Sequence, residues 1–450
     1  MRWLLAIFVI LFVSLALQAG LVAYAGYVLL GVFAVSRYLA RAWVASLHAE
    51  CSISTDPREI DDVLEIIVTV RNDGGLFIPW VLVEHALSEH VLILRKLTVN
   101  GRRLKVLALR ARGEERLKYR VTFHRRGYYQ FGPLHLETGD VFGLHRRHRV
   151  LTAPAFVLVF PRVLPLARYD FASERPIGEV RLQNRLFDDP TRTAGVRPYQ
   201  LGDPLQRIHW RATARTGELH SRVYEPTTLA GATILLDFHA AGYPARKEPH
   251  RSELAVTLAA SIAYAVAAMN QQVGFASNGR DATERIRNEA VSEPEFASRG
   301  SARESYEEKR ASKRLKPVIV ETRRGYDQFA QIRETLARLE LTDGLSFTAM
   351  LLEIAPRLPR DATLVVLLPQ VDIETSVALG HLRRRGFAIT AILVGMADDG
   401  SDARVVAHGR LLAERIRDVR FVNTEADIRA LGSRAATLIP TDYAVAAKLD

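Results

Sequence analysis

Cysteine is nearly absent from this chain, because Cys51 is the only cysteine among 450 residues. A single cysteine excludes an intrachain disulfide, a CxxC redox pair and any zinc or iron–sulfur site made of several cysteines. The sequence also lacks an HExxH helix, a GxxxxGK(S/T) phosphate loop and a GxSxG nucleophile elbow. The usual signatures of metalloproteases, P-loop proteins and α/β-hydrolases are therefore missing, and the sequence predicts no cofactor.

Glycine and proline are scarce, at 28 and 19 residues, which excludes a collagen-like or low-complexity chain. Apolar residues make up 48% and charged residues 25%, as in ordinary globular proteins. The length leaves room for two or three domains. The net charge of +11 suits anionic lipid, nucleic acid or an acidic protein without choosing among them.

Charge is absent from Trp3 to Val35, a run longer than the roughly 20 residues that one spanning helix needs. The polar, flexible sequence Gln18-Ala19-Gly20 divides this run into two apolar blocks, Trp3–Leu17 and Leu21–Val35. The pattern predicts a transmembrane helical hairpin over residues 1–44.

Basic residues flank both blocks, with Arg2 before the first and Arg37 and Arg41 after the second. By the positive-inside rule, two crossings place both flanks, and the bulk of the chain, in the cytoplasm. The alternatives are one long span and a signal peptide cleaved near Ala19.

Residues 45–165 have apolar residues with period 2, which predicts a small all-β sandwich. Strands are expected at Val63–Val70, Leu76–Leu87, Val91–Val99, Arg116–Phe123, Tyr128–Leu136 and Phe156–Phe160. Basic residues are dense in this segment, and they are interpreted either as solvated strand faces or as contacts with anionic lipid headgroups. Nucleic acid is not expected, because no motif for binding it is recognisable.

From residue 231 to residue 450, β-branched runs alternate with amphipathic stretches, which predicts an α/β domain with a mostly parallel sheet covered on both faces. Strands are expected at Ala232–Leu236, Val273–Ala276, Pro317–Glu321, Thr363–Leu368 and Phe387–Val394. Helices are expected at Ser252–Met269, Tyr326–Leu339, Phe347–Leu358, Ile373–Arg385 and Leu411–Arg417. Residues 278–316 are interpreted as a charged insertion.

The intervening segment, residues 166–230, contains a short predicted helix, Pro204–Thr216. Asp203 is expected to cap its start and Gly217 to end it. Apolar residues recur along one face of this helix, which is expected to pack beside the following sheet; they are Leu205, Ile208 and Ala212.

Three arginines repeat on another side of that helix at i, i+4 and i+8, namely Arg207, Arg211 and Arg215. This stripe is interpreted as a contact for an acidic partner surface, with Trp210 as a core residue or interface anchor; the alternative is solvation or pairing with nearby carboxylates. His209 lies off the stripe, and we assign it no catalytic role because no partner group is identified.

Two long runs in this sequence carry a family resemblance. The first extends from Arg197 to Leu219 and continues in Val223-Tyr224-Glu225, and the second extends from Arg126 to Leu144. Both are similar to the bacterial domain-of-unknown-function family fifty-eight. The positions that carry the resemblance are Gly127, Gly132, Pro133, Asp140, Phe142, Gly143, Gly202, Asp203, Trp210, Arg215, Gly217 and Glu225.

The resemblance implies a protein of the bacterial cytoplasmic (inner) membrane that begins with paired helices. It further implies that the C-terminal half is similar to a von Willebrand factor A domain, which is Rossmann-like, and that a MoxR-type AAA+ ATPase is often encoded nearby. No established reaction comes with it. An adaptor role in the assembly or activation of other proteins, at the cell envelope, is the expectation that follows.

A metal-binding A domain holds Mg²⁺ with an Asp-x-Ser-x-Ser run after its first strand, because this cation prefers oxygen ligands. The corresponding run here begins at Asp237, but His239 and Ala241 replace both hydroxyl residues. No metal is expected at this loop.

These expectations combine into a membrane-anchored, non-catalytic interaction protein that works with a MoxR-type AAA+ ATPase and contacts membrane lipid. Its expected partner-binding residues are Arg207, Trp210, Arg211 and Arg215. The alternative is an unrecognised membrane-associated hydrolase that uses His209 with Asp203 or Asp237.

Overall fold

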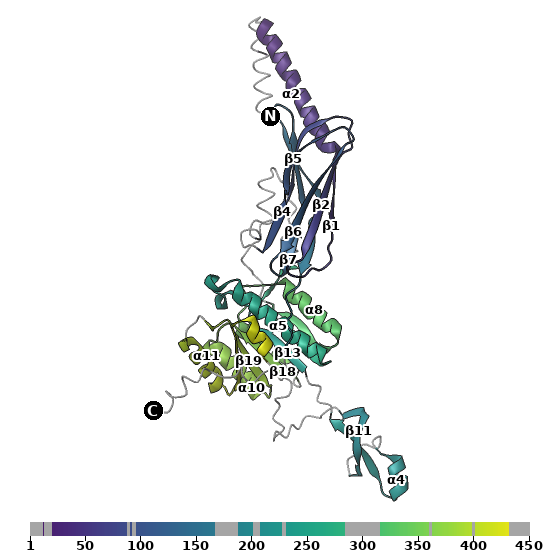
Figure 1. Cartoon of the computed structure of the whole chain (residues 1–450), viewed down its shortest axis with the longest axis vertical. Coiled ribbons are helices and arrows are strands. Elements are labelled where there is room, and N and C mark those ends of the chain that lie inside the picture. Colours follow the sequence, from purple (N-terminus) through teal and green to yellow (C-terminus); the bar gives the residue numbers. More distant parts are fainter. Residues whose placement is uncertain are drawn as a thin grey trace. The chain divides into compact units, whose positions relative to one another are not determined.

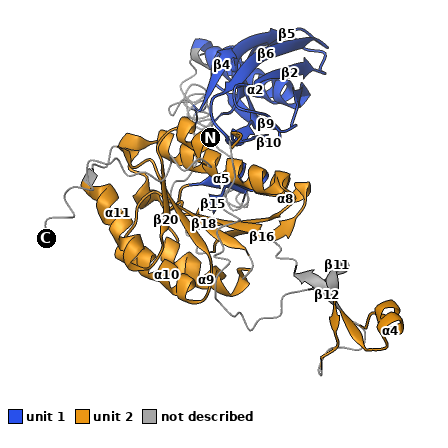
Figure 2. Cartoon of the chain, turned by 60° about the horizontal axis from the view of Figure 1, so that its bottom comes forward, with its two compact units in different colours: residues 1–162, 280–313, 333–340 blue, residues 163–279, 314–332, 341–450 orange. Residues whose placement is uncertain are grey.

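A computed structural model describes residues 12, 20–87, 91, 96–166, 188–200, 208–226, 231–283, 316–359, 362–397 and 401–431. The chain divides into two compact units, which Figure 2 distinguishes by colour. Unit 1 comprises residues 1–162, 280–313 and 333–340. Unit 2 comprises residues 163–279, 314–332 and 341–450.

Helix α2 (Gly20–Ser46) belongs to unit 1, and among the described residues it alone is long and apolar enough to span a membrane (Figure 1). This confirms an apolar helix near the N-terminus. The first block of the predicted hairpin lies outside the described residues, apart from Phe12.

The helix continues from Val35, where the uncharged run ends, to Ser46, and its later turns have a second role. Phe33, Ser36, Ala40 and Trp43 follow helical spacing and are all buried, and α2 packs along strands β8 and β9 of unit 1. Trp43 is part of the β core itself. A helix that is apolar all round in its first half thus becomes amphipathic in its second half.

Unit 1 is mainly β, as predicted. One four-stranded antiparallel sheet has the order β1-β2-β6-β4, and a second has the order β5-β3-β8-β9. The strands are β1 (Leu47–Ile53), β2 (Val63–Asn72), β3 (Ile78–His85), β4 (Leu97–Gly101), β5 (Leu104–Leu109), β6 (Glu114–Phe123), β8 (Leu134–Gly139) and β9 (Arg146–Thr152). A further pair joins β7 (Gly127–Phe131) to β10 (Ala155–Val159).

Both four-stranded sheets contribute to one core. Leu64, Ile66, Val68 and Val70 alternate along β2 and are fully buried, which is the face that the period-2 pattern predicts. Val91 is helical, so the strand expected from that residue begins only at Leu97. The sequence pattern did not predict β1, β5 and β9.

Unit 1 is completed by residues from much later in the chain. Strand β15 (Arg280–Asp281) pairs with β17 (Leu339–Glu340), and Arg280 forms a 2.7 Å ion pair with Glu340. Arg126 is buried and donates from Nη1 to the carbonyl oxygens of Leu336 and Leu339, at 2.7 and 2.8 Å. The beginning of the predicted charged insertion is therefore ordered structure, while residues 284–315 lie outside the described residues.

Unit 2 contains a six-stranded sheet of order β16-β14-β13-β18-β19-β20. Its strands are β13 (Gly231–Leu236), β14 (Gln272–Ser277), β16 (Val318–Arg324), β18 (Thr363–Leu368), β19 (Ile389–Val394) and β20 (Asp418–Val422). All neighbouring pairs are parallel except β14 with β16. The central strands are continuous buried runs, as expected for a sheet covered on both faces.

Helices lie on both faces of this sheet (Figure 2). Helix α5 (His250–Ala268) contacts β13, β14 and β19, and α8 (Tyr326–Arg338) meets it through a Phe329–Tyr264 ring contact. The other face is covered by α9 (Phe347–Ile354), α10 (Ile373–Arg384) and α11 (Ser401–Ala413), which share one core with the sheet. Short 3-10 turns occur at η2 (Ala240–Gly242), η3 (Ala245–Lys247) and η4 (Ala355–Arg357).

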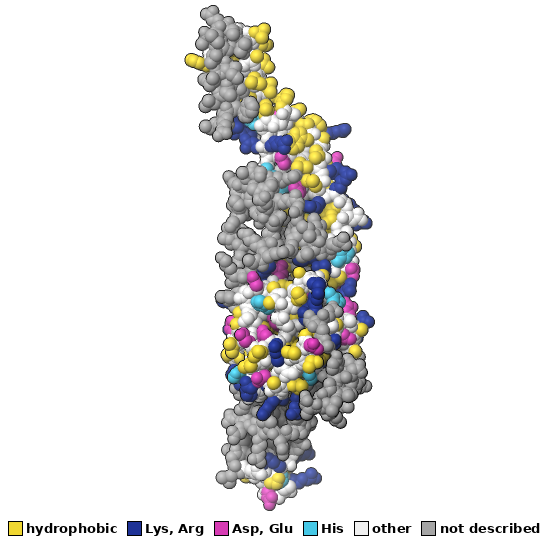
Figure 3. Space-filling model, turned by 90° about the vertical axis from the view of Figure 1, so that its left-hand side faces the viewer, with side chains coloured by type: hydrophobic (Ala, Val, Ile, Leu, Met, Phe, Trp, Pro, Cys, Tyr) yellow, Lys and Arg dark blue, Asp and Glu magenta, His cyan; other side chains and the backbone are white. Residues whose placement is uncertain are grey.

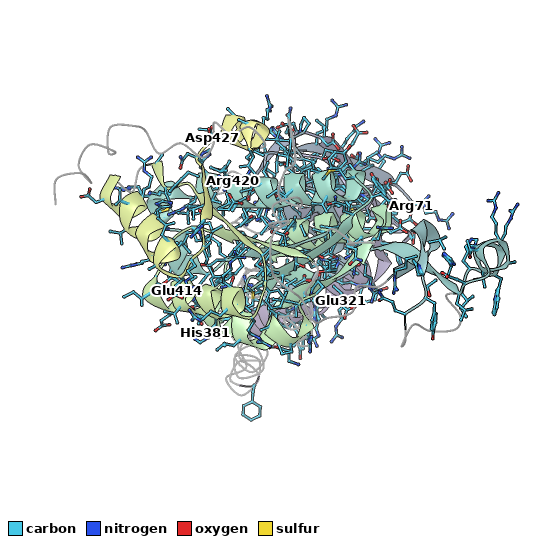
Figure 4. The ribbon with its side chains drawn as sticks, turned by 90° about the horizontal axis from the view of Figure 1, so that it is seen from below. Arg71, Glu321, His381, Glu414, Arg420 and Asp427 are labelled. Carbon is cyan, nitrogen blue, oxygen red and sulfur yellow. The ribbon has the colours of Figure 1, made fainter. Side chains whose placement is uncertain are left out.

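The C-terminal part of the sheet differs from the expectation. The helix predicted at Leu411–Arg417 is wrong, because α11 ends at Ala413 and Arg415 turns the backbone at a φ of 61°. Strand β20 was not predicted, since it carries two charges. Buried Arg420 pairs with Asp418 at 3.0 Å and donates to the carbonyl of Leu431, which follows helix α12 (Glu425–Ala430) (Figure 4).

We predict that truncating Trp43 destabilises unit 1 although the residue lies on the apolar helix. Trp43→Ala should lower the free energy of unfolding by about 3–5 kcal/mol, because it empties a core position. Tyr38→Ala is the control, since Tyr38 is 66% exposed and should change stability by no more than about 0.5 kcal/mol. Urea unfolding of the full chain in mild detergent measures both; equal losses would place Trp43 outside the core.

Candidate functional site

The carboxyl edge of the six-stranded sheet is the first candidate site. The chain order reverses at β13, with β14 and β16 on one side and β18, β19 and β20 on the other. Ligands of open α/β sheets bind outside the carboxyl ends of the strands at such a reversal. Here Asp237 follows β13, Asn278 follows β14 and Asp372 follows β18.

Asp237 is held by a tight set of bonds. Its backbone N–H donates to the carbonyl of Leu367 at 3.0 Å, and its Oδ1 accepts from Asn278 Nδ2 at 3.0 Å and from the His239 N–H at 3.1 Å. The Tyr243 hydroxyl donates to its carbonyl oxygen at 2.8 Å. The carboxylate is thereby fixed in one orientation.

Burial raises the pKa of Asp237 to about 6, and the negative charge of Asp372 acts in the same direction. The hydrogen bond from Asn278 and the positive potential of His239 oppose this rise. A buried carboxyl group with a raised pKa at a sheet reversal is a common feature of functional sites, although structural carboxylates show it too.

The loop after β13, where no metal is expected, can be compared with what a Mg²⁺ site requires of its side chains. His239 Nδ1 accepts the Ala241 N–H at 3.2 Å and caps η2, so this nitrogen is engaged in shaping the loop. Ala241 offers no side-chain oxygen. Within the described ranges, no three His, Cys, Asp or Glu side chains come close enough together to hold a metal ion. The absence of a metal remains a prediction.

Asn278 and Tyr243 were not predicted from the sequence. Asn278 Oδ1 accepts the Phe238 N–H at 2.6 Å, and its Nδ2 also donates to the carbonyl of Leu345 at 3.0 Å. It therefore fastens three segments at the edge. Its position two residues after the predicted strand Val273–Ala276 was the available signal.

The second candidate site is the β11–β12 arm, which we define as residues 188–200 and 208–226. Strands β11 (Asp188–Pro198) and β12 (His220–Pro226) pair antiparallel, and α4 (Trp210–Thr216) lies between them in the chain. Glu225 lies on β12. Leu205, Gly202, Asp203 and Arg207 lie outside the described residues.

The predicted start of the helix at Pro204 is wrong for the residues that can be compared. Ile208 forms an antiparallel bridge with Ser221, and His209 caps the helix by accepting the Ala212 N–H on Nδ1 at 3.0 Å. The expected cap, Asp203, is therefore not the N-cap of α4. Gly217 ends the helix as predicted, with a φ of 79° and its N–H donating to Thr213.

The helix buries none of its own residues, so the expected packing face does not form. Ile208 is buried, but it belongs to the bridge and not to the helix. Trp210 is 66% exposed and is not a core residue. Arg211 and Arg215 remain four residues apart on α4; both are exposed, and neither forms an ion pair with another described residue.

The second family-like run lies in unit 1. Gly127 begins β7, and Gly132-Pro133 separates β7 from β8; a side chain at Gly132 would crowd the ring of His85. Asp140, Phe142 and Gly143 lie in the loop between β8 and β9. Asp140 accepts the N–H groups of Phe142 and His145, at 3.0 and 2.5 Å, and thus organises this loop.

Comparison with known proteins gives one family match and distant relatives. Residues 195–292 match the family model described as "Protein of unknown function DUF58". This range holds α4, β12, β13, α5 and β14. "Uncharacterized protein YeaD" of Bacillus subtilis (strain 168) is 23% identical over 221 residues, which cover 49% of this chain and 53% of that protein. The chain thus spans about half the length of this curated relative, and both matches support the family resemblance.

Two solved structures each align with about a quarter of the chain. The CARDB domain of the PF1109 protein from Pyrococcus furiosus is 18% identical, with a TM-score of 0.18, and the alignment covers 25% of this chain and 91% of that one. The PapD-like domain 7 of human CEP192 is 11% identical, with a TM-score of 0.17, and covers 25% and 82%.

We predict a pH dependence of stability that depends on Asp237. Since folding raises the pKa of this carboxyl group from its ordinary 3.8 to about 6, the folded state binds the proton more tightly than the unfolded chain. The stability that this carboxyl group contributes is therefore fully present below about pH 4. As the pH rises through about 6, this contribution is lost, and the free energy of unfolding falls by roughly 3 kcal/mol. Asp237→Asn keeps an acceptor for Asn278 and should remove this part of the slope. Chemical unfolding of both proteins between pH 4 and pH 7 measures the difference, and parallel curves would contradict the prediction.

Magnesium should leave the stability unchanged, because residues 237–241 after β13 offer one buried carboxylate and no serine or threonine hydroxyl. A ligand at 100 times its dissociation constant would stabilise the protein by about 2.7 kcal/mol. Thermal unfolding with and without millimolar Mg²⁺ tests this. A clear rise in Tm that Asp237→Asn abolishes would mean that other groups complete a metal site.

Proposed function

We propose that this chain is a membrane-anchored, non-catalytic interaction protein whose β11–β12 arm binds an acidic surface of a MoxR-type AAA+ ATPase. The partner-binding residues are Arg207, Trp210, Arg211 and Arg215. The activity served is the assembly or activation of other proteins at the bacterial inner membrane. The bulk of the chain lies in the cytoplasm, below a transmembrane hairpin of which α2 is the second arm.

The observation that carries this proposal is the exposure of α4. A seven-residue helix with no buried residue gains no tertiary packing, yet it is held at both ends by His209 and Gly217. Its surface combines an exposed tryptophan with two exposed arginines that form no ion pair with any other residue the structure describes. Trp and Arg are the residue types most enriched at binding hot spots, and a cationic surface favours association with an acidic partner.

The remaining domain assignments are part of the same proposal. The two sheets of unit 1 correspond to the β-sandwich, over residues 45–165. The strand order and the antiparallel edge strand of unit 2 support a von Willebrand factor A-like domain over residues 231–450. Such a domain with a loop poor in metal ligands suits protein contact without catalysis.

A charge reversal on α4 tests the proposed interface. Arg211→Glu with Arg215→Glu should weaken binding of the chain's own MoxR-type ATPase about tenfold or more, because both charges would repel an acidic surface. The matched control is Arg246→Glu with Arg357→Glu, which changes the same charge at two other exposed arginines of unit 2. Binding by the detergent-solubilised full chain is measured by titration. Equal affinity of both double variants would overturn the interface.

A substitution at His209 distinguishes the proposed partner binding from the alternative, a hydrolase that uses His209. Asn caps helices as well as any residue, so His209→Asn should preserve α4 while removing the imidazole. We expect its binding of the ATPase to match that of the wild type. A hydrolytic activity of the purified chain that this variant abolished would instead support catalysis through His209.

A further inference from the structure

The loop between β8 and β9 exposes three large apolar side chains almost in sequence. Val141 and Phe142 are each 68% exposed, and Leu144 is 51% exposed. Single exposed apolar residues are common on protein surfaces, but a cluster of this kind marks a contact with another apolar phase. We call residues 140–145 the Asp140 loop.

This loop lies beside helix α2. The ring of His145 meets the ring of Phe33 edge to face, with 4.6 Å between their centroids. Burial raises the pKa of Asp140, but hydrogen bonds from the backbone N–H groups of the loop outweigh this effect and hold the pKa below its usual range. The contact between His145 and Phe33 fixes the loop at the level of Phe33.

That level lies within the uncharged part of the helix. The first charge on α2 is Arg37, and Phe33 precedes it by four residues, which is about 6 Å along the axis at 1.5 Å per residue. Tyr38, which is 66% exposed, follows Arg37. Tyrosine and arginine next to an apolar run are typical of the boundary between lipid and water.

Basic residues follow the uncharged part of α2 in the chain, and others follow the Asp140 loop directly on β9. Arg37 and Arg41 on α2 and Arg146, Arg147 and Arg149 on β9 are all exposed. Arg149 also donates from Nη1 to the carbonyl of Val44 at 3.2 Å, which joins β9 to the helix. In Figure 3, hydrophobic side chains follow the exposed length of α2, and Lys and Arg side chains begin where the helix reaches the strands.

The loop is also preformed. The Asp140 carboxylate accepts two of its backbone N–H groups, and Gly143 turns the chain at a φ of 74°, which strongly favours glycine. A loop that is already ordered loses little conformational entropy when it enters another phase.

We propose that the Asp140 loop inserts Val141, Phe142 and Leu144 into the interfacial region of the same bilayer that α2 spans, with the surrounding arginines at the phosphate level. The helix and the loop then form two attachment points, which fix the rotation of unit 1 about the helix axis. This inference rests on the proposed membrane anchoring. It assigns to the Asp140 loop, part of the second family-like run, contact with lipid.

Site-directed labelling of the full chain tests the insertion. In a Cys51→Ser background, single cysteines replace Phe142, Phe77 or Leu29, and each carries an NBD fluorophore. Phe77 is the matched control, because it is similarly exposed, at 55%, but lies in the loop after β2. That loop is at the other end of α2, where the Asp73 N–H donates to the Ser46 carbonyl. Leu29 is 50% exposed in the uncharged part of the helix. The protein is reconstituted in vesicles of phosphatidylcholine and phosphatidylglycerol.

Two quenchers distinguish the outcomes. We expect acyl-chain doxyl lipid to quench the labels at positions 29 and 142 and aqueous iodide to quench the label at position 77. Doxyl quenching at 29 with iodide quenching at 142 would overturn the loop insertion alone. Iodide quenching at both positions would overturn the membrane anchor and the insertion with it. Protection of position 142 from both quenchers would mean that protein covers the loop, which also overturns the proposal.

A second variant tests the apolar contact. Phe142→Asp places a charge on an exposed side chain, so unit 1 should retain its unfolding transition while a label at Leu144 loses most of its doxyl quenching. Phe142→Leu should retain the quenching. Unchanged quenching in Phe142→Asp would overturn the contact between this loop and the lipid.

Discussion

The backbone passes from helix α2 to strand β1 without an intervening loop, and buried Trp43 and Leu47 lie on either side of that junction. The helix therefore cannot rotate or tilt relative to the two β sheets of unit 1 without disturbing their core. A flexible Gly/Ser-rich linker at this position would leave the β sheets free to rotate relative to the helix. Here one continuous helix is apolar and exposed in its first half and is part of the β core in its second half.

The positions of the β-unit loops follow from that junction. The helix passes the start of β9 before it ends, so the loop preceding β9 lies beside the uncharged part of α2 while the loop after β2 lies beside Ser46. Side chains of similar exposure in these two loops thus meet different surroundings. Several of the basic residues that are dense in unit 1 pair within the sheets, as Lys118 and Arg120 do with Glu65.

The periodic parts of the sequence predicted the fold well. Alternation along β2 and the buried runs of β13, β18 and β19 were recognisable, because burial on one or both faces leaves a direct pattern in residue type. Strand β20 was missed because Arg420 and Asp418 satisfy each other, which no local pattern reveals. The start of α4 was misplaced because Asp203-Pro204 is a strong local helix signal, whereas the bridge between Ile208 and Ser221 is a non-local one. At the candidate sites, the sequence identified Asp237 and the arginines but not Asn278, whose role depends on three segments meeting.

The contacts of Arg126 link the completion of unit 1 to the order in which the chain is synthesised. Its buried guanidinium donates to carbonyls of residues 336 and 339, so unit 1 is incomplete while only its first 162 residues have left the ribosome. Membrane insertion of α2 would then precede the closure of the domain attached to it by the time needed to translate most of unit 2. A chain that stops before residue 336 would therefore leave the Arg126 guanidinium without these two carbonyl acceptors.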